Sequence, residues 1–127
     1  MMTSDAGLAD EQYCYLTTTG RKTGRPHTIE IWFGLAEGTI YMLSGAGSET
    51  PDGTGARADW VRNLQKQPRV EVRIGEGVYP GAARVVPAGG GEDSLARRLL
   101  LDKYQPASRE DLSGWSEMSL PVAVDLD

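Results

Sequence analysis

The chain has 127 residues, a formal net charge of −5 and a charged fraction of 24%. A chain of this length fits one domain with a core of its own, so residues 1–127 are predicted to form a single domain. The negative charge argues against a general nucleic-acid binder, and we expect no nucleic-acid partner.

The cysteine content and the hydropathy indicate the cellular setting. Cys14 is the only cysteine, which excludes an internal disulfide and favours a reduced, cytoplasmic setting. The first residues lack the basic start and the apolar run of a signal peptide. No apolar stretch is long enough to span a bilayer, so we expect no stable membrane association.

The chain begins with a polar segment and continues with a predicted hairpin. Residues 1–12 are small and polar, and are predicted to form a loose arm or one short helical turn. Residues 13–19 are rich in aromatic and β-branched side chains and residues 27–32 alternate in character, so both are predicted strands. The tight connection between them is bounded by Gly20 and Gly24, which can adopt the positive φ that such a turn needs.

The predicted hairpin turn is basic. Arg21 and Lys22 lie within it, and Arg25 and His27 follow it. Backbone N–H groups and cationic side chains that converge at a strand turn form an anion site. The alternative is a solvated hairpin tip, because basic residues are common at surface turns. His27 is the only histidine and has no cysteine or second histidine near it, so no metal site is expected.

A third strand and a long loop follow the hairpin. Residues 39–44 form an apolar run after the Glu37-Gly38 turn signal, and successive strands with tight links predict an antiparallel meander. Residues 45–58 are glycine-rich and are predicted to form a long loop, of the kind that is usually functional or disordered. The loop lacks the Gly-Lys-Ser or Gly-Lys-Thr end of a nucleotide phosphate-binding loop.

A short helix is predicted from residue 59 to residue 67. Asp59 can cap its start and Pro68 ends it. Trp60 and Leu64 lie one turn apart on the same face. Burial in the core and contact with a ligand are equally good interpretations of Trp60.

Further strands are predicted in the second half of the chain. Residues 70–74 alternate between apolar and charged side chains, which predicts a strand with one buried face. Residues 78–86 form another strand, in which Pro80-Gly81 predicts an edge position or a bulge. Residues 120–124 are predicted to form the last strand and complete the sheet.

A second helix is predicted between these strands, over residues 93–104, with Ala96, Leu100 and Tyr104 on one face. A polar link that contains Trp115 follows it. The whole pattern predicts a mainly β, α+β fold: a small barrel of about six mostly antiparallel strands with two or three short helices.

Several segments resemble one known family. The run from Leu16 to Pro26 closely resembles the signature of the deazaflavin-dependent nitroreductase and quinone reductase family. Further matching segments are Leu43-Ser44-Gly45-Ala46-Gly47, Trp60-Val61-Arg62-Asn63-Leu64 and Pro68-Arg69-Val70. The resemblance is good from Leu16 to Ile74 and looser beyond.

The resemblance implies a split β-barrel that binds coenzyme F420 and passes its hydride to a quinone, a nitroaromatic or an activated enone. The residues that it implies for cofactor binding are Arg21, Lys22, Thr23, His27, Thr28, Trp32, Leu43, Ser44, Gly45, Trp60, Arg62 and Asn63. Ser44 corresponds to the active-site serine of the family and is the first catalytic candidate. Tyr104 is the second, because its phenol could donate a hydrogen bond over the cofactor ring.

Other interpretations stay open at this point. The chain could be an FMN-dependent reductase of the same general fold, a non-catalytic carrier of a deazaflavin or a lipid, or a small barrel with an unrelated ligand. Residues 105–107 lack the tyrosines that shape the nitroimidazole pocket of some relatives, which argues against nitroimidazole activation. Either a monomer or a homodimer is compatible with the sequence.

Overall fold

The computed structural model describes residues 8, 10–45 and 58–127. Within them lie seven strands in one sheet, three α-helices and one 3-10 helix. The strands are β1 (Cys14–Thr19), β2 (Pro26–Ile31), β3 (Gly34–Ala36), β4 (Thr39–Ser44), β5 (Arg69–Ile74), β6 (Gly77–Val85) and β7 (Leu120–Leu126). The helices are α2 (Asp59–Lys66), α3 (Gly91–Tyr104), the 3-10 helix η1 (Gln105–Ala107) and α4 (Ser113–Met118).

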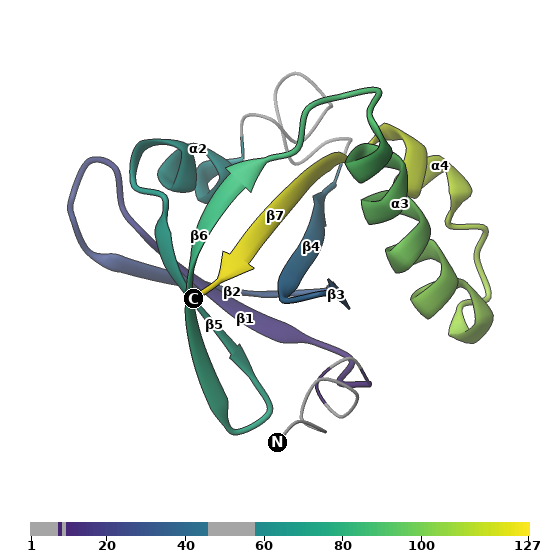
Figure 1. Ribbon diagram of the computed structural model, residues 1–127, viewed down its shortest axis with the longest axis horizontal. Coiled ribbons are helices and arrows are strands. Elements are labelled where there is room, and N and C mark those ends of the chain that lie inside the picture. Colours follow the sequence, from purple (N-terminus) through teal and green to yellow (C-terminus); the bar gives the residue numbers. More distant parts are fainter. Residues whose placement is uncertain (1–7, 9, 46–57) are drawn as a thin grey trace.

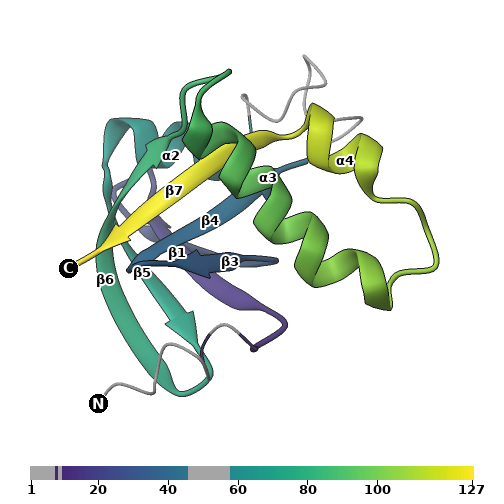
Figure 2. The same ribbon diagram turned by 45° about the vertical axis from the view of Figure 1, so that its right-hand side comes forward.

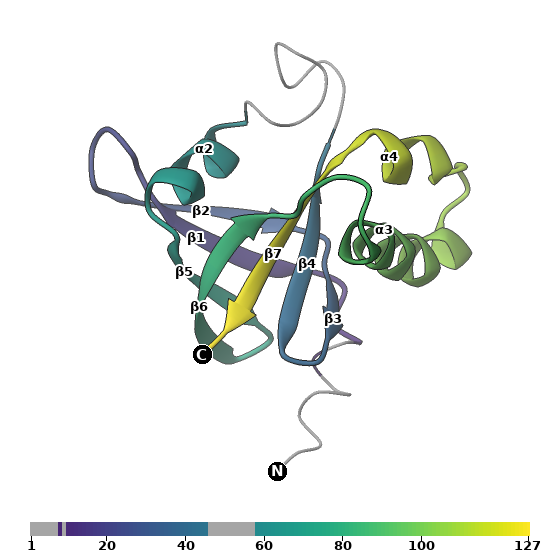
Figure 3. The same cartoon turned by 45° about the horizontal axis from the view of Figure 1, so that its top comes forward.

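All strand pairs are antiparallel, and the order across the sheet is β2-β1-β5-β6-β7-β4-β3. The sheet curls into a half-barrel with β2 and β3 as its edges (Figure 1). Figure 3 shows α2 beside the β1–β2 hairpin, and α3 with α4 on the opposite side. The mainly β, split-barrel fold predicted from the sequence is confirmed, with seven strands in place of about six.

The predicted hairpin of β1 and β2 is confirmed, and the two strands pair along their whole length. Its turn is closed by the Gly20 N–H, which donates to the Arg25 carbonyl at 2.7 Å, and by the Gly24 N–H, which donates to the Gly20 carbonyl at 2.8 Å. Gly24 has φ +73°, a conformation that L side chains rarely adopt. The turn therefore depends on glycine at that position.

The predicted meander is wrong, because β4 pairs with β7 and β3, and not with β2. β2 ends before Trp32, and the next side chain, Phe33, is fully buried in the core. The following strand, β3, forms the opposite edge of the sheet. β3 has three residues, which are too few to show the alternation of apolar and polar side chains that predicts a strand. The β4–β7 pairing joins Thr39 to Asp125, residues 86 apart, and such non-local pairing leaves no local sequence pattern.

The concave side of the sheet holds the larger of two hydrophobic clusters. β5 alternates as predicted, with every second side chain buried in this cluster. Val61 and Leu64 of α2 are fully buried and pack against the same strands. Cys14 is also fully buried, and burial raises the pKa of its thiol to about 12, which is typical of a structural cysteine in the core.

The second cluster lies under α3, which crosses β4 and β7 (Figure 2). Ala96, Leu100 and Tyr104 are buried there, as their spacing predicts. α3 begins at Gly91, two residues before the predicted start. Trp115 packs against this cluster from α4, so the predicted polar link contains a helix.

A polar network fastens the start of α3 to the sheet. The Arg84 guanidinium donates to both carboxylate oxygens of Glu92 at 2.7 Å and to Asp125 Oδ2 at 2.7 Å. Tyr41 donates to Glu92 Oε2 at 2.7 Å, and Thr39 donates to Asp125 Oδ1 at 3.0 Å. Hydrogen bonds from Arg84 lower the pKa of both carboxyl groups. Burial, with the hydrogen bond to Glu92, raises the pKa of Tyr41 to about 12.

Of two local expectations, the one for β6 is met in its edge alternative and the one for Asp59 is wrong. β6 pairs with β5 in continuous register, without a bulge. It pairs with β7 only from Gly81 onward, so the strand begins with β5 as its one neighbour, which is the edge position that Pro80 predicted. A Cβ atom at Gly81 would lie 2.6 Å from the Asp125 carbonyl oxygen, which explains the glycine. Asp59 does not cap α2: Ala58 is the N-cap residue, and the Asp59 carboxylate pairs with Arg21 instead.

The predicted N-terminal arm and glycine-rich loop fall largely outside the described residues, which omit residues 1–7, 9 and 46–57. In the part of the chain that is described, no helix has the length and apolar character needed to cross a membrane. Nor does that part bring three or more His, Cys, Asp or Glu side chains into an arrangement that could hold a metal ion.

Candidate active site

The larger cavity of the site has a volume of about 760 Å³ and is walled mainly by aromatic and aliphatic side chains; we call it the aromatic cavity. Its lining residues are Tyr13, Ile29, Glu30, Ile31, Trp32, Leu43, Ser44, Gly45, Trp60, Glu110, Leu112 and Trp115. They come from β2, the end of β4, α2 and the segment around α4. All three tryptophans of the chain lie in this wall.

A second cavity of about 470 Å³ adjoins it at the hairpin turn; we call it the basic cavity. Its lining residues are Gly20, Arg21, Lys22, Thr23, His27, Thr28, Ile29, Asp59, Trp60 and Asn63. Ile29 and Trp60 line both cavities, which therefore lie side by side. A ligand with a flat apolar part and an anionic part could occupy both.

Gly20 is one of the residues that line the basic cavity. Gly20 is buried, and a Cβ atom added there would lie 2.7 Å from both His27 Nε2 and Thr23 Oγ1. Those two side chains therefore close over the glycine, and any larger residue would displace them. The Thr23 hydroxyl also accepts the Arg25 N–H at 3.2 Å, which holds the turn in shape.

Asn63 joins the hairpin turn to α2. Its Oδ1 accepts the Arg21 N–H at 3.2 Å and Arg21 Nη1 at 2.9 Å, while its Nδ2 donates to Thr18 Oγ1 at 3.2 Å. Arg21 Nη2 then reaches the Asp59 carboxylate at 3.2 Å. Asn63 is 4% exposed, so its amide is used inside the protein to orient Arg21. Asp59, whose side chain is 88% exposed, adds a screened surface ion pair.

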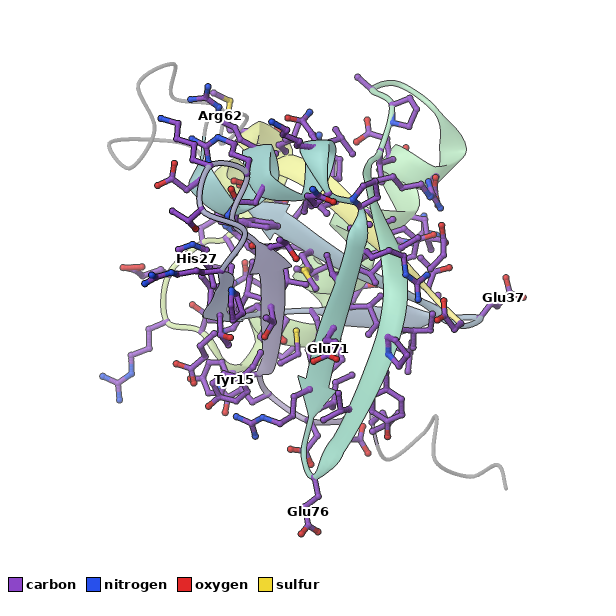
Figure 4. All side chains as sticks on the ribbon, turned by 90° about the vertical axis from the view of Figure 1, so that its left-hand side faces the viewer. Tyr15, His27, Glu37, Arg62, Glu71 and Glu76 are labelled. Atoms are coloured by element: carbon purple, nitrogen blue, oxygen red, sulfur yellow. The ribbon has the colours of Figure 1, made fainter. Side chains whose placement is uncertain are left out.

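Arg62 differs from the other sequence-predicted binding residues, because it lines neither cavity. Its side chain is exposed on α2. Figure 4 shows Arg62 and His27 on the side of the hairpin turn, and Glu76 at the far end of the molecule. The remaining residues predicted for cofactor binding all line one of the two cavities.

Ser44 lies at the end of β4, where it pairs with Leu120 of β7. It is 2% exposed and lines the aromatic cavity together with Leu43 and Gly45. The strand pairing fixes the backbone at this point, so the serine occupies a rigid position on the cavity wall.

Tyr104 lies behind the cavity wall. Its ring stacks on Trp32, with centroids 4.2 Å apart and planes 5° apart, and Trp32 meets Trp115 edge-on at 5.5 Å. The Tyr104 hydroxyl accepts the Phe33 N–H at 3.0 Å and lies within donating distance of the carbonyls of Gln12, at 2.8 Å, and Phe33.

Tyr104 does not line the aromatic cavity, and burial raises the pKa of its phenol to about 12. The phenol therefore braces Trp32 and the backbone in front of it. This position does not match the expected one over the cofactor ring, so we do not retain Tyr104 as a proton donor.

Several cavity residues escaped the sequence analysis. Tyr13, Ile29, Glu30 and Ile31 were seen only as strand residues, and Glu110, Leu112 and Trp115 fell in the polar link. The available signal was Trp115, a large apolar residue within a polar segment, which is unusual unless it packs against something. Leu112 is held by its N–H, which donates to Gln105 Oε1 at 2.7 Å.

Comparison with known proteins is consistent with this geometry. The fold is similar to an F420-H2 dependent reductase, FDR-A (TM-score 0.68, 22% identity, 91% of this chain and 94% of that one). It is also similar to HutZ, the heme storage protein from Vibrio cholerae (TM-score 0.73, 12% identity, 99% and 89%), and to an FAD-binding protein from Mesorhizobium loti (TM-score 0.65, 16% identity, 100% and 90%).

At these identities the structures establish the fold alone. The sequence match is more informative, because residues 6–127 match the family described as F420H2-dependent quinone reductase. The match spans almost the whole chain, including the basic turn, Ser44 and Trp60. The protein therefore belongs to the F420H2-dependent quinone reductase family.

Proposed function

We propose that this protein is a reductase that uses reduced F420 and transfers a hydride to an uncharged quinone or a similar electron-poor acceptor. The observation that carries the proposal is the pair of adjacent cavities, one basic and one aromatic. F420 has a flat ring and a tail with a phosphodiester and glutamate carboxylates, so the two halves of the ligand match the two cavities. Family membership supports the same conclusion.

In the basic cavity, Arg21 and Lys22 are proposed to bind the anionic tail. Arg21 is already oriented by Asn63, so little side-chain entropy would be lost on binding. A side chain at Gly20 would displace His27 and Thr23, so the glycine preserves the shape of the basic cavity. Arg62 is not assigned to the tail, because it lies outside both cavities.

In the aromatic cavity, Trp32, Trp60 and Ile29 supply flat apolar surface for a ring. When bound, reduced F420 supplies a hydride and a proton, which together convert a quinone to a hydroquinone. The tryptophan walls keep water from the acceptor and hold it in a fixed plane, which lowers the entropic cost of the reaction.

Ser44 is the proposed hydrogen-bond donor in this reaction. A hydride that reaches a quinone leaves negative charge on a carbonyl oxygen, and a fixed donor stabilises that charge. The Ser44 hydroxyl and the neighbouring Gly45 N–H are the groups at the end of β4 that could fill this role. Replacing Ser44 by alanine should lower kcat by about tenfold or more, with cofactor affinity changed by at most a few-fold.

The test begins with titration of the purified protein with F420, FMN and FAD, followed by fluorescence. We expect F420 to bind most tightly. The double change Arg21→Ala, Lys22→Ala should weaken its affinity by about 2 kcal/mol or more, roughly 30-fold in Kd. A control with the same charge change, Lys66→Ala with Arg98→Ala, alters exposed residues outside both cavities and should have little effect.

The second step adds menadione to the complex with reduced F420. Oxidation of the cofactor by wild type, and slow oxidation by Ser44→Ala, would support the proposal. Tighter binding of FMN than of F420 would assign the site to a flavin. Tight F420 binding without oxidation by any quinone, nitroaromatic or enone would make the protein a carrier.

A further inference from the structure

The short helix α4 borders the aromatic cavity and has little core of its own. It has six residues, and Ser116 is the one among them that is buried. Its N-cap residue, Leu112, makes no side-chain cap hydrogen bond. A helix of this length does not persist by itself in water, so α4 depends on what it is fastened to. It lies beside α3 (Figure 2), and one side chain of α3, Arg97, holds it there.

Arg97 binds the carboxyl end of α4. Its Nη1 lies within hydrogen-bond distance of three carbonyl oxygens, those of Ser116 at 2.7 Å, Glu117 at 2.8 Å and Ser119 at 2.9 Å. The last carbonyls of a helix have no partner within it, and a cation interacts favourably with that end of the helix dipole. One guanidinium group therefore supplies what the end of α4 lacks.

Arg97 is itself fixed on α3. Its Nε donates to Asp93 Oδ1 at 2.7 Å, one turn earlier, and Asp93 Oδ2 accepts the Gly89 N–H at 2.9 Å. Both charged side chains are largely shielded from water, with 23% of Arg97 and 14% of Asp93 exposed. The hydrogen bond from Gly89, together with that from Arg97, lowers the pKa of the Asp93 carboxyl, so the pair stays charged at neutral pH. The guanidinium that reaches α4 is thus held in one orientation by a charge-assisted bond.

Trp115 connects α4 to the cavity. Its indole meets Trp32 edge-on, with ring centroids 5.5 Å apart, and both tryptophans line the aromatic cavity. Leu112, directly before α4, lines it as well, and its N–H donates to Gln105 Oε1 at 2.7 Å. This wall is therefore anchored at both ends, by Gln105 at its start and by Arg97 at its end.

We propose that Arg97 is a positioning residue for the electron acceptor: by fixing α4 it holds Trp115 where the acceptor stacks. This inference rests on the proposed function, in which the anionic tail occupies the basic cavity and the cofactor ring lies against Ile29 and Trp60, the residues that line both cavities. Leu112 and Trp115 line the aromatic cavity alone, so they border the space that is left for the acceptor. Without Arg97 the wall is free to move, and it stacks on the acceptor less tightly.

The experiment removes the arginine and the tryptophan separately and together. The variants are Arg97→Gln, Trp115→Ala and the two combined. Arg98→Gln is the matched control, because Arg98 is the next residue of α3, is exposed and lines neither cavity. Arg84→Gln is a second control: it breaks two ion pairs at a residue that lines neither cavity, and so reports the effect of lost stability alone.

Two measurements are made on each full-length protein: the Kd of menadione from quenching of tryptophan fluorescence without cofactor, and kcat and KM for menadione with reduced F420. Arg97→Gln should raise the Kd and KM of menadione by about five- to tenfold, with kcat and the Kd of F420 within about twofold of wild type. Trp115→Ala should give a rise of the same size, and the combined variant no further rise, because Arg97 acts through Trp115. Arg97→Lys keeps the charge but not the planar fork, so its KM should lie between those of wild type and Arg97→Gln. Both controls should stay within about twofold of wild type.

A wild-type Kd and KM for menadione in Arg97→Gln would overturn the inference. So would additive effects of Arg97→Gln and Trp115→Ala, because Arg97 would then act by another route, and so would an equal rise in Arg84→Gln, because lost stability would then be the cause. If Arg97→Gln does not fold, Arg97→Lys takes its place, and a wild-type KM in that variant overturns the inference. If wild type oxidises reduced F420 and the variants match it, the proposed function stands and only the role of Arg97 is refuted. If wild type binds no F420 or reduces no acceptor, both fail.

Discussion

Replacing Asn63 by alanine tests whether one buried amide builds the basic cavity. Asn63 makes three hydrogen bonds, two from Arg21 and one to Thr18, and is 4% exposed. Bonds of this kind contribute about 1 kcal/mol each and the one from a charged guanidinium about 2 kcal/mol. Arg21 keeps Asp59 and gains water in the variant, so the expected loss is about 2–3 kcal/mol.

The assay is urea unfolding followed by tryptophan fluorescence, with thermal unfolding alongside. In a domain of this size the same loss lowers Tm by roughly 10 °C. Arg62→Ala is the matched control, because Arg62 is the preceding residue of the same helix, is exposed and lines neither cavity. It should change the free energy of unfolding by at most about 0.5 kcal/mol.

Affinity for F420 provides a second readout of the same variants. Asn63→Ala releases Arg21 from its fixed orientation, so we expect it to weaken F420 binding by about tenfold, whereas Arg62→Ala leaves affinity within about twofold. If both variants unfold at the same urea concentration, Asn63 has no structural role in the turn. If Asn63→Ala loses stability but binds F420 normally, Arg21 does not need the orientation that we assign to it.

Two other predictions follow from the buried polar groups. Tyr104→Phe leaves the Phe33 N–H without its acceptor and should lower the free energy of unfolding in urea by about 1–3 kcal/mol. The kcat with menadione should stay within about twofold of wild type, because the phenyl ring still stacks on Trp32. A large fall in kcat with unchanged stability would restore Tyr104 as a proton donor. Arg84 lowers the folded-state pKa values of Glu92 and Asp125, so the contribution of these carboxylates to stability is complete above the ordinary carboxyl pKa and is lost as pH falls through the lowered values. Between neutral pH and about pH 3, the Tm of wild type should therefore fall more steeply than the Tm of Arg84→Gln. Equal slopes of Tm against pH would refute the linkage.

Local patterns in the sequence predicted the elements that depend on local interactions. The β1–β2 hairpin followed from two strand-like runs joined by a Gly20–Gly24 turn, and the buried face of β5 followed from its alternation. The order of the strands in the sheet was not predicted by local patterns, because β4 pairs with β7, a strand far from it in the sequence. Pairings between distant segments depend on the shape of the whole core, which no short window of sequence contains.

The candidate site divides in the same way. The basic turn, Ser44 and Trp60, which line the cavities, were predicted because they lie in contiguous motifs that resemble a known family. Glu110 and Trp115 were missed, since they reach the cavity only after α3 brings the segment that follows it back to β4. The position of Tyr104 on its helical face correctly predicted burial, and its hydroxyl bonds to the Phe33 backbone, outside the lining of the aromatic cavity.

The edge strand β2 connects the fold to the proposed function. Among the described strands it has a single neighbour, β1, and such an edge normally needs charge or cover to avoid pairing with other chains. Ile29 and Ile31 are nevertheless apolar and only half buried, and both line the aromatic cavity. A strand that served the core alone would gain from burying them or from making them polar. Their partial exposure in the cavity wall is what a surface requires if it is to receive a flat apolar ring.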